Sequence, residues 1–228
     1  MNPNHATLES MSQAVWYNRW TMKIFSSFLR GDILEVGFGN GNFTKSLKTY
    51  GRVWAIDIDT KYLRKIKKDI GSNIHIGKGD IEKGNYFFKK RLFDTIVCLN
   101  VLEHIRNDSR AFSNMFEILH RGGYLILLVP AHSCLYGSID ISVGHIRRYE
   151  LQELLTLFVR YDMIIHIRRR INFFGALGWF IAGKIINATS VAENHLRYFN
   201  SIAPFVLPLE SIIEPIIGTS YIVVAQKK

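Results

Sequence analysis

The stretch DILEVGFGNGNFT, residues 32–44, decides the fold. It runs from an apolar segment through three glycines at alternate positions, Gly37, Gly39 and Gly41, into a helical pattern. Glycine lets the backbone turn sharply and approach a ligand closely, and the free N–H groups of a following helix attract a carboxylate or a phosphate. The GxGxG spacing differs from the GxGxxG of dinucleotide sites. The pattern predicts a strand, a ligand-binding loop and a helix; a plain strand-to-helix turn is the alternative.

Apolar runs and helical stretches alternate along the rest of the chain. The predicted strands are residues 33–36, 52–57, 74–76, 95–99, 124–129, 163–167 and 221–225, and the predicted helices are 39–50 after a short loop, 60–70, 109–120 and 150–158. We expect Gly122-Gly123 to close the third of these helices, because a helix C-terminus favours a residue that tolerates positive φ. This order predicts a parallel sheet with helices on both faces, which binds ligands at the carboxyl ends of its strands.

Composition sets the broad class. A chain of 228 residues suits a single domain, 1–228, and 48% hydrophobic with 21% charged residues is typical of a globular protein. Two cysteines, Cys98 and Cys134, leave no disulfide framework and no metal-cluster spacing, so we expect no metal and a reducing cytoplasm. The first 12 residues lack the apolar core of a signal peptide. Residues 171–186 are apolar but shorter than the ~20 residues of a membrane span, and Lys184 interrupts them.

The charge of the chain leaves its partners open. The formal net charge of +10 is compatible with nucleic acid, an anionic membrane or an acidic small substrate. Because the basic residues are spread along the chain, the charge is equally compatible with a role in solubility alone.

Three further polar sites follow predicted strands. Asp57 comes 20 positions after Gly37, where a carboxylate can accept both hydroxyls of a ribose, whereas Asp59 is expected to cap the next helix. Asp80 and Ile81 follow the third strand, where an adenine would receive a carboxylate and an apolar side chain; an ordinary Gly-Asp turn is the alternative. Asn100 marks the point where the fourth strand leaves the sheet.

These segments together resemble the class I S-adenosylmethionine-dependent methyltransferases. The resemblance includes the acidic residue that opens the glycine loop, the acid after the second strand, the Gly-Asp pair, the segment FDTIVCLNVLEHI (93–105) and the approach HRGGYLI (120–126) to the fifth strand. It covers residues 15–170 and the last strand. The combination is more specific than any single piece.

The resemblance implies a fold, a cofactor and a set of site residues. It implies a Rossmann-like, seven-stranded, mostly parallel sheet whose last strand is antiparallel, with an N-terminal helical lid arm (1–31) and an apolar helical insertion (171–210) before that strand. The cofactor would be S-adenosylmethionine. The residues implied to bind it are Glu35, Gly37, Gly39 and Gly41 for the methionine part, Asp57 and Ile58 for the ribose, Asp80 and Ile81 for the adenine, and Asn100 beside the sulfonium. Tyr17 of the lid would face the sulfonium, since a cation is attracted to a ring face; packing of the arm is the alternative.

The segment 131–149 is predicted to be the acceptor loop. It contains LYG…D…GHIRRY, which resembles a subgroup of these enzymes with varied small substrates. His145, His132, Asp140 and Tyr149 are candidates for a catalytic base. Arg147 and Arg148 are candidates for binding an acidic acceptor. In the alternative, Asp140 pairs with Arg148 and His145 caps the next helix, so that these residues only hold the loop closed.

The sequence thus predicts methyl transfer to a small-molecule or lipid-like acceptor. A non-catalytic S-adenosylmethionine-binding or scaffolding protein, and a nicotinamide-dependent oxidoreductase, are the alternatives. No nucleic-acid partner is expected, because Asn100 opens no Asn-Pro-Pro-Tyr motif, neither cysteine follows a proline and no RNA-binding module is present. For the insertion, a cover over the acceptor pocket, a homodimer face, peripheral contact with a membrane and extra core all remain open.

Overall fold

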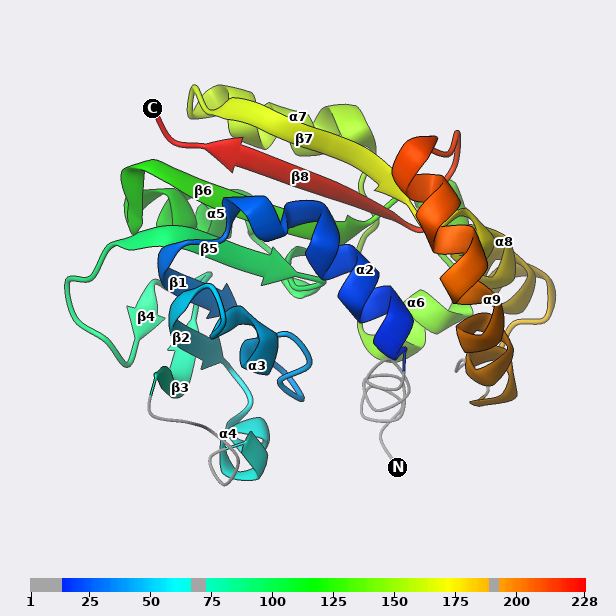
Figure 1. The fold of residues 1–228 in the computed structure, drawn as a ribbon, viewed down its shortest axis with the longest axis horizontal. Helices are drawn as coiled ribbons and strands as arrows, with labels where there is room; N and C mark the ends of the chain where they lie inside the picture. Colours follow the sequence, from blue (N-terminus) through cyan, green and yellow to red (C-terminus); the bar gives the residue numbers. More distant parts are fainter. Residues whose placement is uncertain (1–13, 67–72, 189–192) are drawn as a thin grey trace.

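A single mixed sheet organises the chain in the computed structural model, which describes residues 14–66, 73–188 and 193–228 (Figure 1). The strands are β1 Gly31–Val36, β2 Gly51–Asp57, β3 Ile74–Asp80, β4 Asn85–Tyr86, β5 Phe93–Leu99, β6 Leu119–Pro130, β7 Ile164–Ile171 and β8 Ser220–Gln226. Their order in the sheet is β4-β3-β2-β1-β5-β6-β8-β7. The predicted α/β class is therefore confirmed.

The last strand runs against its neighbours. β8 lies between β6 and β7 and pairs antiparallel with both, whereas β1, β2, β3, β5 and β6 pair in parallel. This is the arrangement that the resemblance implied. The structure adds one strand to the seven expected: the two-residue β4, which pairs antiparallel with the end of β3.

The central strands of the sheet are buried on both faces. Side chains alternate between the two faces of a strand, and in β1 Leu34 and Val36 join one apolar cluster while Ile33 joins the other. Helices α5 (Asp108–Glu117) and α7 (Leu151–Arg160) contribute Phe112 and Phe158 to the first cluster. A strand buried on both sides needs a continuous apolar sequence, which is why the predicted runs identify the central strands.

The second face is covered by elements from both ends of the chain. Helix α2 (Val15–Phe25) buries Phe25 there, and the α9 helix (Glu193–Ile212) buries Leu207 in the same cluster. The indole nitrogen of Trp20 in α2 donates to the Ser211 hydroxyl of α9 at 2.8 Å. Part of the predicted lid arm is thus packed helix, while its residues 1–13 lie outside the described residues.

Shorter helical elements complete the fold. They are η1 Ser26–Phe28, α3 Thr44–Leu47, α4 Thr60–Ile66, η2 Leu102–His104, η3 Ser133–Leu135, α6 Ser138–Val143, α8 Phe173–Phe180 and the π-helical η4 Ile181–Ile185. The predicted acceptor loop therefore contains two helical turns, η3 and α6. The predicted insertion consists of α8, η4 and most of α9. In the described part of the chain, no helix is both long and apolar enough to cross a membrane.

Two predicted helices differ from those observed, and the end of a third lies outside the described residues. The helix expected within 39–50 is one turn, α3, because the glycine stretch extends the loop to Phe43. The helix expected at 60–70 is described as α4 only as far as Ile66, and positions 67–70 lie outside the described residues.

The prediction that Gly122-Gly123 close a helix was wrong. Helix α5 ends at Glu117, with Ile118 at its C-cap, and β6 has begun by Leu119. The pairing of β5 with β6 jumps from Phe93–Leu119 to Thr95–Tyr124, and Gly122, at φ 75°, lies in this irregular stretch of the strand. Positive φ is needed here, but for a strand irregularity and not for a helix cap.

Candidate active site

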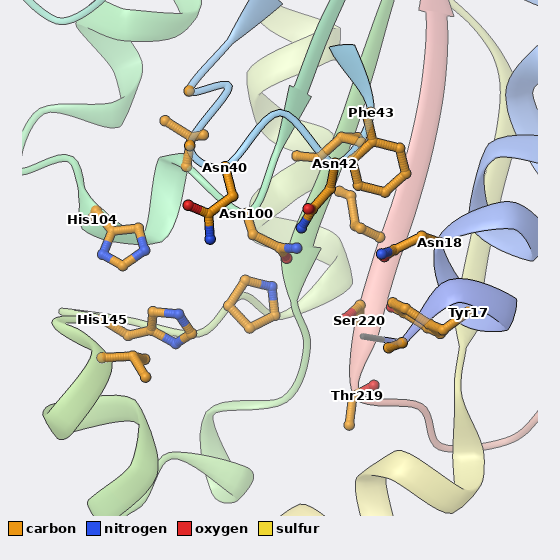
Figure 2. Close-up of a pocket in the computed structure, with 18 of the residues that line it drawn as sticks. Tyr17, Asn18, Asn40, Asn42, Phe43, Asn100, His104, His145, Thr219 and Ser220 are labelled. Carbon is orange, nitrogen blue, oxygen red and sulfur yellow. The ribbon is translucent and has the colours of Figure 1, made fainter. Parts of the chain in front are cut away.

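One cavity lies at the carboxyl ends of β1, β2, β3, β5 and β6. Its volume is about 960 Å³, and residues from α2, α6, η4, α8 and α9 close it from the other side. Of the sequence-predicted site residues, the structure brings these to its wall: Tyr17, Glu35, Gly37, Gly39, Asp57, Ile58, Asp80, Ile81, Asn100, His145 and Arg148. The others, which are Gly41, His132, Asp140, Arg147 and Tyr149, do not line it. Figure 2 shows the polar residues that converge on this cavity.

The glycine loop is open on the side of the cavity. Gly37 and Gly39 have φ values of 75° and 48°, a region that favours glycine. A Cβ on Gly37 would meet a Val101 methyl group at 2.3 Å, whereas a Cβ on Gly39 would have no atom within 4 Å. The loop therefore leaves room for a ligand to lie directly against its backbone.

Glu35 is a buried carboxyl group at the end of β1. One of its oxygens, Oε2, has no hydrogen-bond partner among the described residues. Burial raises the pKa of Glu35 to about 8, although the neighbouring Thr44 side chain opposes the shift. Because an unpaired buried carboxylate is costly, the side chain suits a ligand that brings a positive charge or a donor.

Asp57 links the second strand to the glycine loop. Its carboxylate accepts hydrogen bonds from the backbone N–H of Gly39 at 2.9 Å and of Asp59 at 2.8 Å. Burial raises the pKa of Asp57. Each oxygen has further lone pairs for a ligand. Asp59 accepts from the Lys61 N–H at 2.8 Å, as expected for a residue that caps α4.

The adenine candidates lie at the end of β3. Ile81 is buried and Asp80 is partly exposed, and both line the cavity. The Asp80 carboxylate accepts from the backbone N–H of Lys83 at 3.1 Å. Asp80 therefore forms the turn of the alternative prediction and also lines the cavity.

Asn100 has an unusual backbone conformation. Its φ is 53°, and its N–H donates to the Leu128 carbonyl at 2.8 Å, which fixes the residue at the end of β5. Asparagine tolerates this left-handed region better than most residues. Figure 2 shows its side chain among those of Asn18, Asn40 and Asn42.

Sequence reasoning missed several residues of the cavity. Asn18, Asn40, Asn42 and Phe43 line it, together with Glu82 and His104. Asn40 and Asn42 stand between and after the glycines, so their positions could have been found from the loop pattern. Asn18 could not, because only the packing of α2 against α9 places it there.

Asp140 joins three residues of the predicted acceptor loop (131–149) to Trp179 of α8. Its Oδ1 accepts from His145 Nδ1 at 2.8 Å and from Arg148 Nε at 2.9 Å. Its Oδ2 accepts from the Gly137 N–H and from the Trp179 indole, both at 3.0 Å. Burial alone would raise the pKa of Asp140, but the bond from His145 and the charge of Arg148 lower it overall. The pairing of Asp140 with Arg148, one of the alternatives, is thus present.

His145 and Arg148 combine this internal role with a place on the cavity wall. Arg148 is buried, donates to the Ala131 carbonyl at 2.9 Å, and stacks over the Trp179 ring with its central carbon 5.0 Å from the ring centroid. His145 follows Gly144, which ends α6 at φ 81°. His145 lies several residues before α7, whose N-cap is Glu150, so the alternative in which His145 caps that helix is wrong.

The remaining acceptor candidates lie elsewhere. Tyr149 donates to Asp108 Oδ2 at 2.9 Å, and Arg147 donates to the same oxygen at 2.8 Å. His132 Nδ1 lies 3.2 Å from the Tyr221 hydroxyl. These residues join the segment to η2, α5 and β8, and their predicted catalytic or binding roles stay predictions.

Comparison with known proteins agrees with this geometry. Residues 34–127 match the family model described as "Methyltransferase domain". The match includes the glycine loop, Asp57, Asp80 and Asn100, and it ends within β6.

Two curated proteins match part of the chain, and the matched parts are 40% and 45% of their own lengths. The chain thus spans less than half of each. One is the uncharacterized methyltransferase Bcer98_3087 of Bacillus cytotoxicus, 29% identical over 99 residues, or 42% of this chain.

Solved structures establish the fold. A putative methyltransferase from Bacillus halodurans superposes with a TM-score of 0.60 at 16% identity, covering 92% of this chain and 98% of that chain. The N-methyltransferase NodS of Bradyrhizobium japonicum, solved with S-adenosyl-L-homocysteine, gives 0.53 at 23% identity, covering 68% and 76%. The chain has the Rossmann-like methyltransferase fold.

Proposed function

We propose that this protein is an S-adenosylmethionine-dependent methyltransferase. One observation carries the proposal: the wall of a single cavity contains the open glycine loop, Asp57, and the Glu35 oxygen that has no hydrogen-bond partner among the described residues. The match of residues 34–127 to a methyltransferase domain supports it, as does the likeness to a structure that holds S-adenosyl-L-homocysteine.

The residues present fit this cofactor. The open side of Gly39 leaves space for the methionine part of the cofactor, and the Glu35 oxygen that has no hydrogen-bond partner among the described residues suits an ammonium group. Asp57 has lone pairs left for ribose hydroxyls, and Ile81 offers an apolar face to an adenine. Tyr17 is buried beside Ser220 on the cavity wall (Figure 2), and its ring suits a sulfonium cation.

The cofactor would supply a methyl group bound to a cationic sulfur. The chain's own residues would align an acceptor with that methyl group and exclude water. Asn100 and Tyr17 would flank the methyl group. His145 would act on the acceptor: its Nδ1 donates to Asp140, which leaves a lone pair on Nε2.

The acceptor end of the cavity is apolar, which favours a small or lipid-like acceptor. Phe174, Leu177, Ile181 and Ile186 line it from the helical insertion. The insertion and the residues that follow it expose further large apolar side chains, such as Phe205, which is 75% exposed, and Ile212, which is 82% exposed. Apolar side chains on this scale mark an interaction surface, and together with a net charge of +10 they favour an anionic lipid surface.

Calorimetric titration tests the cofactor directly. We expect S-adenosyl-L-homocysteine to bind with micromolar affinity and NADH not to bind. Asp57→Ala should lower the affinity at least a hundredfold without unfolding the domain. Asp162→Ala, a matched change at an exposed site, should leave it unchanged.

The other outcomes would overturn the proposal. Binding of NADH alone would favour an oxidoreductase. Full affinity in Asp57→Ala would place the cofactor elsewhere. Binding of the cofactor without transfer to any acceptor, once lipids and small acids have been tried, would favour the non-catalytic alternative.

A further inference from the structure

Three side chains of metal-ligating type form a cluster beside the cavity, and two of them, His104 and His145, line its wall. Glu103 and His104 belong to η2, directly after Asn100, and His145 follows α6. One ligand atom from each residue lies within 4.8 Å of the others. The Glu103 Oε1 to His145 Nε2 distance is 3.7 Å, and the two imidazole rings are 4.9 Å apart. We call these residues the Glu–His cluster.

Glu103 has an unmet requirement. Its side chain is fully buried, and neither carboxyl oxygen has a hydrogen-bond partner in the part of the chain that the structure describes. The Nε2 atom of His145, at 3.7 Å from Glu103 Oε1, is too far for a hydrogen bond. Buried polar groups are almost always hydrogen-bonded or metal-bound. The position is held by the backbone, since the Glu103 carbonyl accepts from the Ile146 N–H at 2.9 Å.

Both histidines are held in the form that binds metals. His145 Nδ1 lies 2.8 Å from the Asp140 carboxylate, and His104 Nδ1 lies 3.0 Å from the Gly144 carbonyl. A carbonyl or carboxylate oxygen only accepts, so Nδ1 is the donor in both rings and Nε2 of the neutral ring keeps its lone pair. Metal-binding histidines typically donate their second nitrogen to such an acceptor.

We propose that the Glu–His cluster binds one divalent transition-metal ion. Two imidazole nitrogens and one carboxylate form a ligand set that Zn²⁺, Mn²⁺ and Co²⁺ accept. Three protein ligands leave a position open, and His104 and His145 both line the cavity (Figure 2). The open position would therefore face the cavity. The sequence predicts no metal, because its two cysteines lack the spacing of a metal cluster.

The position suggests what the ion would do. A cation at this place would attract an acceptor hydroxyl and lower its pKa, so that the oxygen loses its proton more easily. His145 would then contribute as a ligand and not as a base. This acceptor role rests on the proposed methyltransferase function, whereas the binding of the ion does not.

Metal titration of the tag-free, chelator-treated protein tests the proposal. We expect one equivalent of Zn²⁺ to bind by calorimetry, and one of Co²⁺ to give the visible absorption of a low-symmetry site. Glu103→Gln keeps the shape of the side chain but removes its charge, and His104→Ala removes one imidazole ligand. Each variant should weaken Zn²⁺ binding at least tenfold. His120→Ala, on β6 and outside the cavity, should have no effect. Circular dichroism checks that each variant is folded.

Two outcomes would overturn the proposal: no stoichiometric ion in the wild type, or equal affinity in wild type, Glu103→Gln and His104→Ala. Failure here is distinguishable from failure of the proposed function. The metal titration uses no cofactor, and binding of S-adenosyl-L-homocysteine should persist after the chelator treatment.

Discussion

At the scale of single residues, Glu35 makes the most direct prediction. Burial raises its pKa from 4.5 to about 8, so the folded state binds a proton more tightly than the unfolded state. The free energy of unfolding should therefore fall as the pH rises from about 4.5 to about 8, with a slope of up to about 1.4 kcal/mol per pH unit from this group. Glu35→Gln should remove this part of the slope in ligand-free protein, as measured by urea unfolding at several pH values.

An exposed carboxylate provides the control for this measurement. Glu117→Gln should retain the wild-type slope, because its side chain is exposed in α5. An unchanged slope in Glu35→Gln would mean that the carboxyl group does not titrate as its burial requires. Cofactor binding should also suffer in Glu35→Gln, since a neutral amide attracts an ammonium group less than a carboxylate does.

The residues that were correctly predicted to line the cavity share one property. Glu35, Asp57, Asp80 and Asn100 end strands or follow them directly, so the sheet alone brings them together. His132, Arg147 and Tyr149 depend instead on how a segment with two helical turns folds back on η2 and β8. The residue types in this segment do not predict how it folds. Glu103 and His104 were visible in the quoted motif, but their chemistry appears only once His145 is placed beside them.

At the scale of elements, the predicted acceptor loop contains two neighbouring arginines, one buried and one partly exposed. Arg148 is buried and paired with Asp140, whereas Arg147 is partly exposed and paired with Asp108. Removing one partner of a buried pair typically costs about 3–5 kcal/mol, and an exposed pair is worth about 1 kcal/mol or less. We therefore expect Arg148→Ala to lower the free energy of unfolding severalfold more than Arg147→Ala.

Chemical denaturation of the two variants, side by side, measures this difference. Similar losses in both would show that Asp140 is adequately stabilised by His145, Trp179 and Gly137 without the arginine. Hydrogen exchange adds a local readout, because Arg148→Ala should expose the amides of α6 before those of the sheet.

Element boundaries were harder to predict than element types. The central strands were found because a strand buried on both faces must be apolar throughout. The glycine pair Gly122-Gly123 misled the prediction, since positive φ serves a strand irregularity as well as a helix end. The two-residue β4 has no pattern of its own, because its pairing with β3 is a tertiary contact.

At the scale of the molecule, the helical insertion is the feature that the sheet does not explain. Glu210 of α9 accepts from the N–H groups of Asn172 and Phe173 at 2.7 and 2.9 Å, which fixes α8 and α9 together. Figure 1 shows these helices at one end of the sheet. The insertion thus supplies apolar residues both to the cavity wall and to the exterior. This arrangement suits the proposed lipid-like acceptor.

Vesicle binding tests this arrangement. We expect the protein to sediment with vesicles that contain anionic lipid, less so with neutral vesicles, and less at high salt because charge attraction is screened. The double variant Ile212→Ser/Ile216→Ser removes two side chains that are 82% and 83% exposed, and it should lower binding severalfold. Val159→Ser, equally apolar but on α7, should bind as the wild type does.

The same variants separate the lipid surface from the competing uses of the insertion. If these side chains form a homodimer face, light scattering should show a dimer that Ile212→Ser/Ile216→Ser dissociates, and vesicle binding should be absent. If these side chains only extend the core, the double variant should lose stability. The high exposure of both side chains argues against this. Equal vesicle binding by the double variant and by Val159→Ser would contradict the lipid surface and leave the net charge as the sole source of attraction.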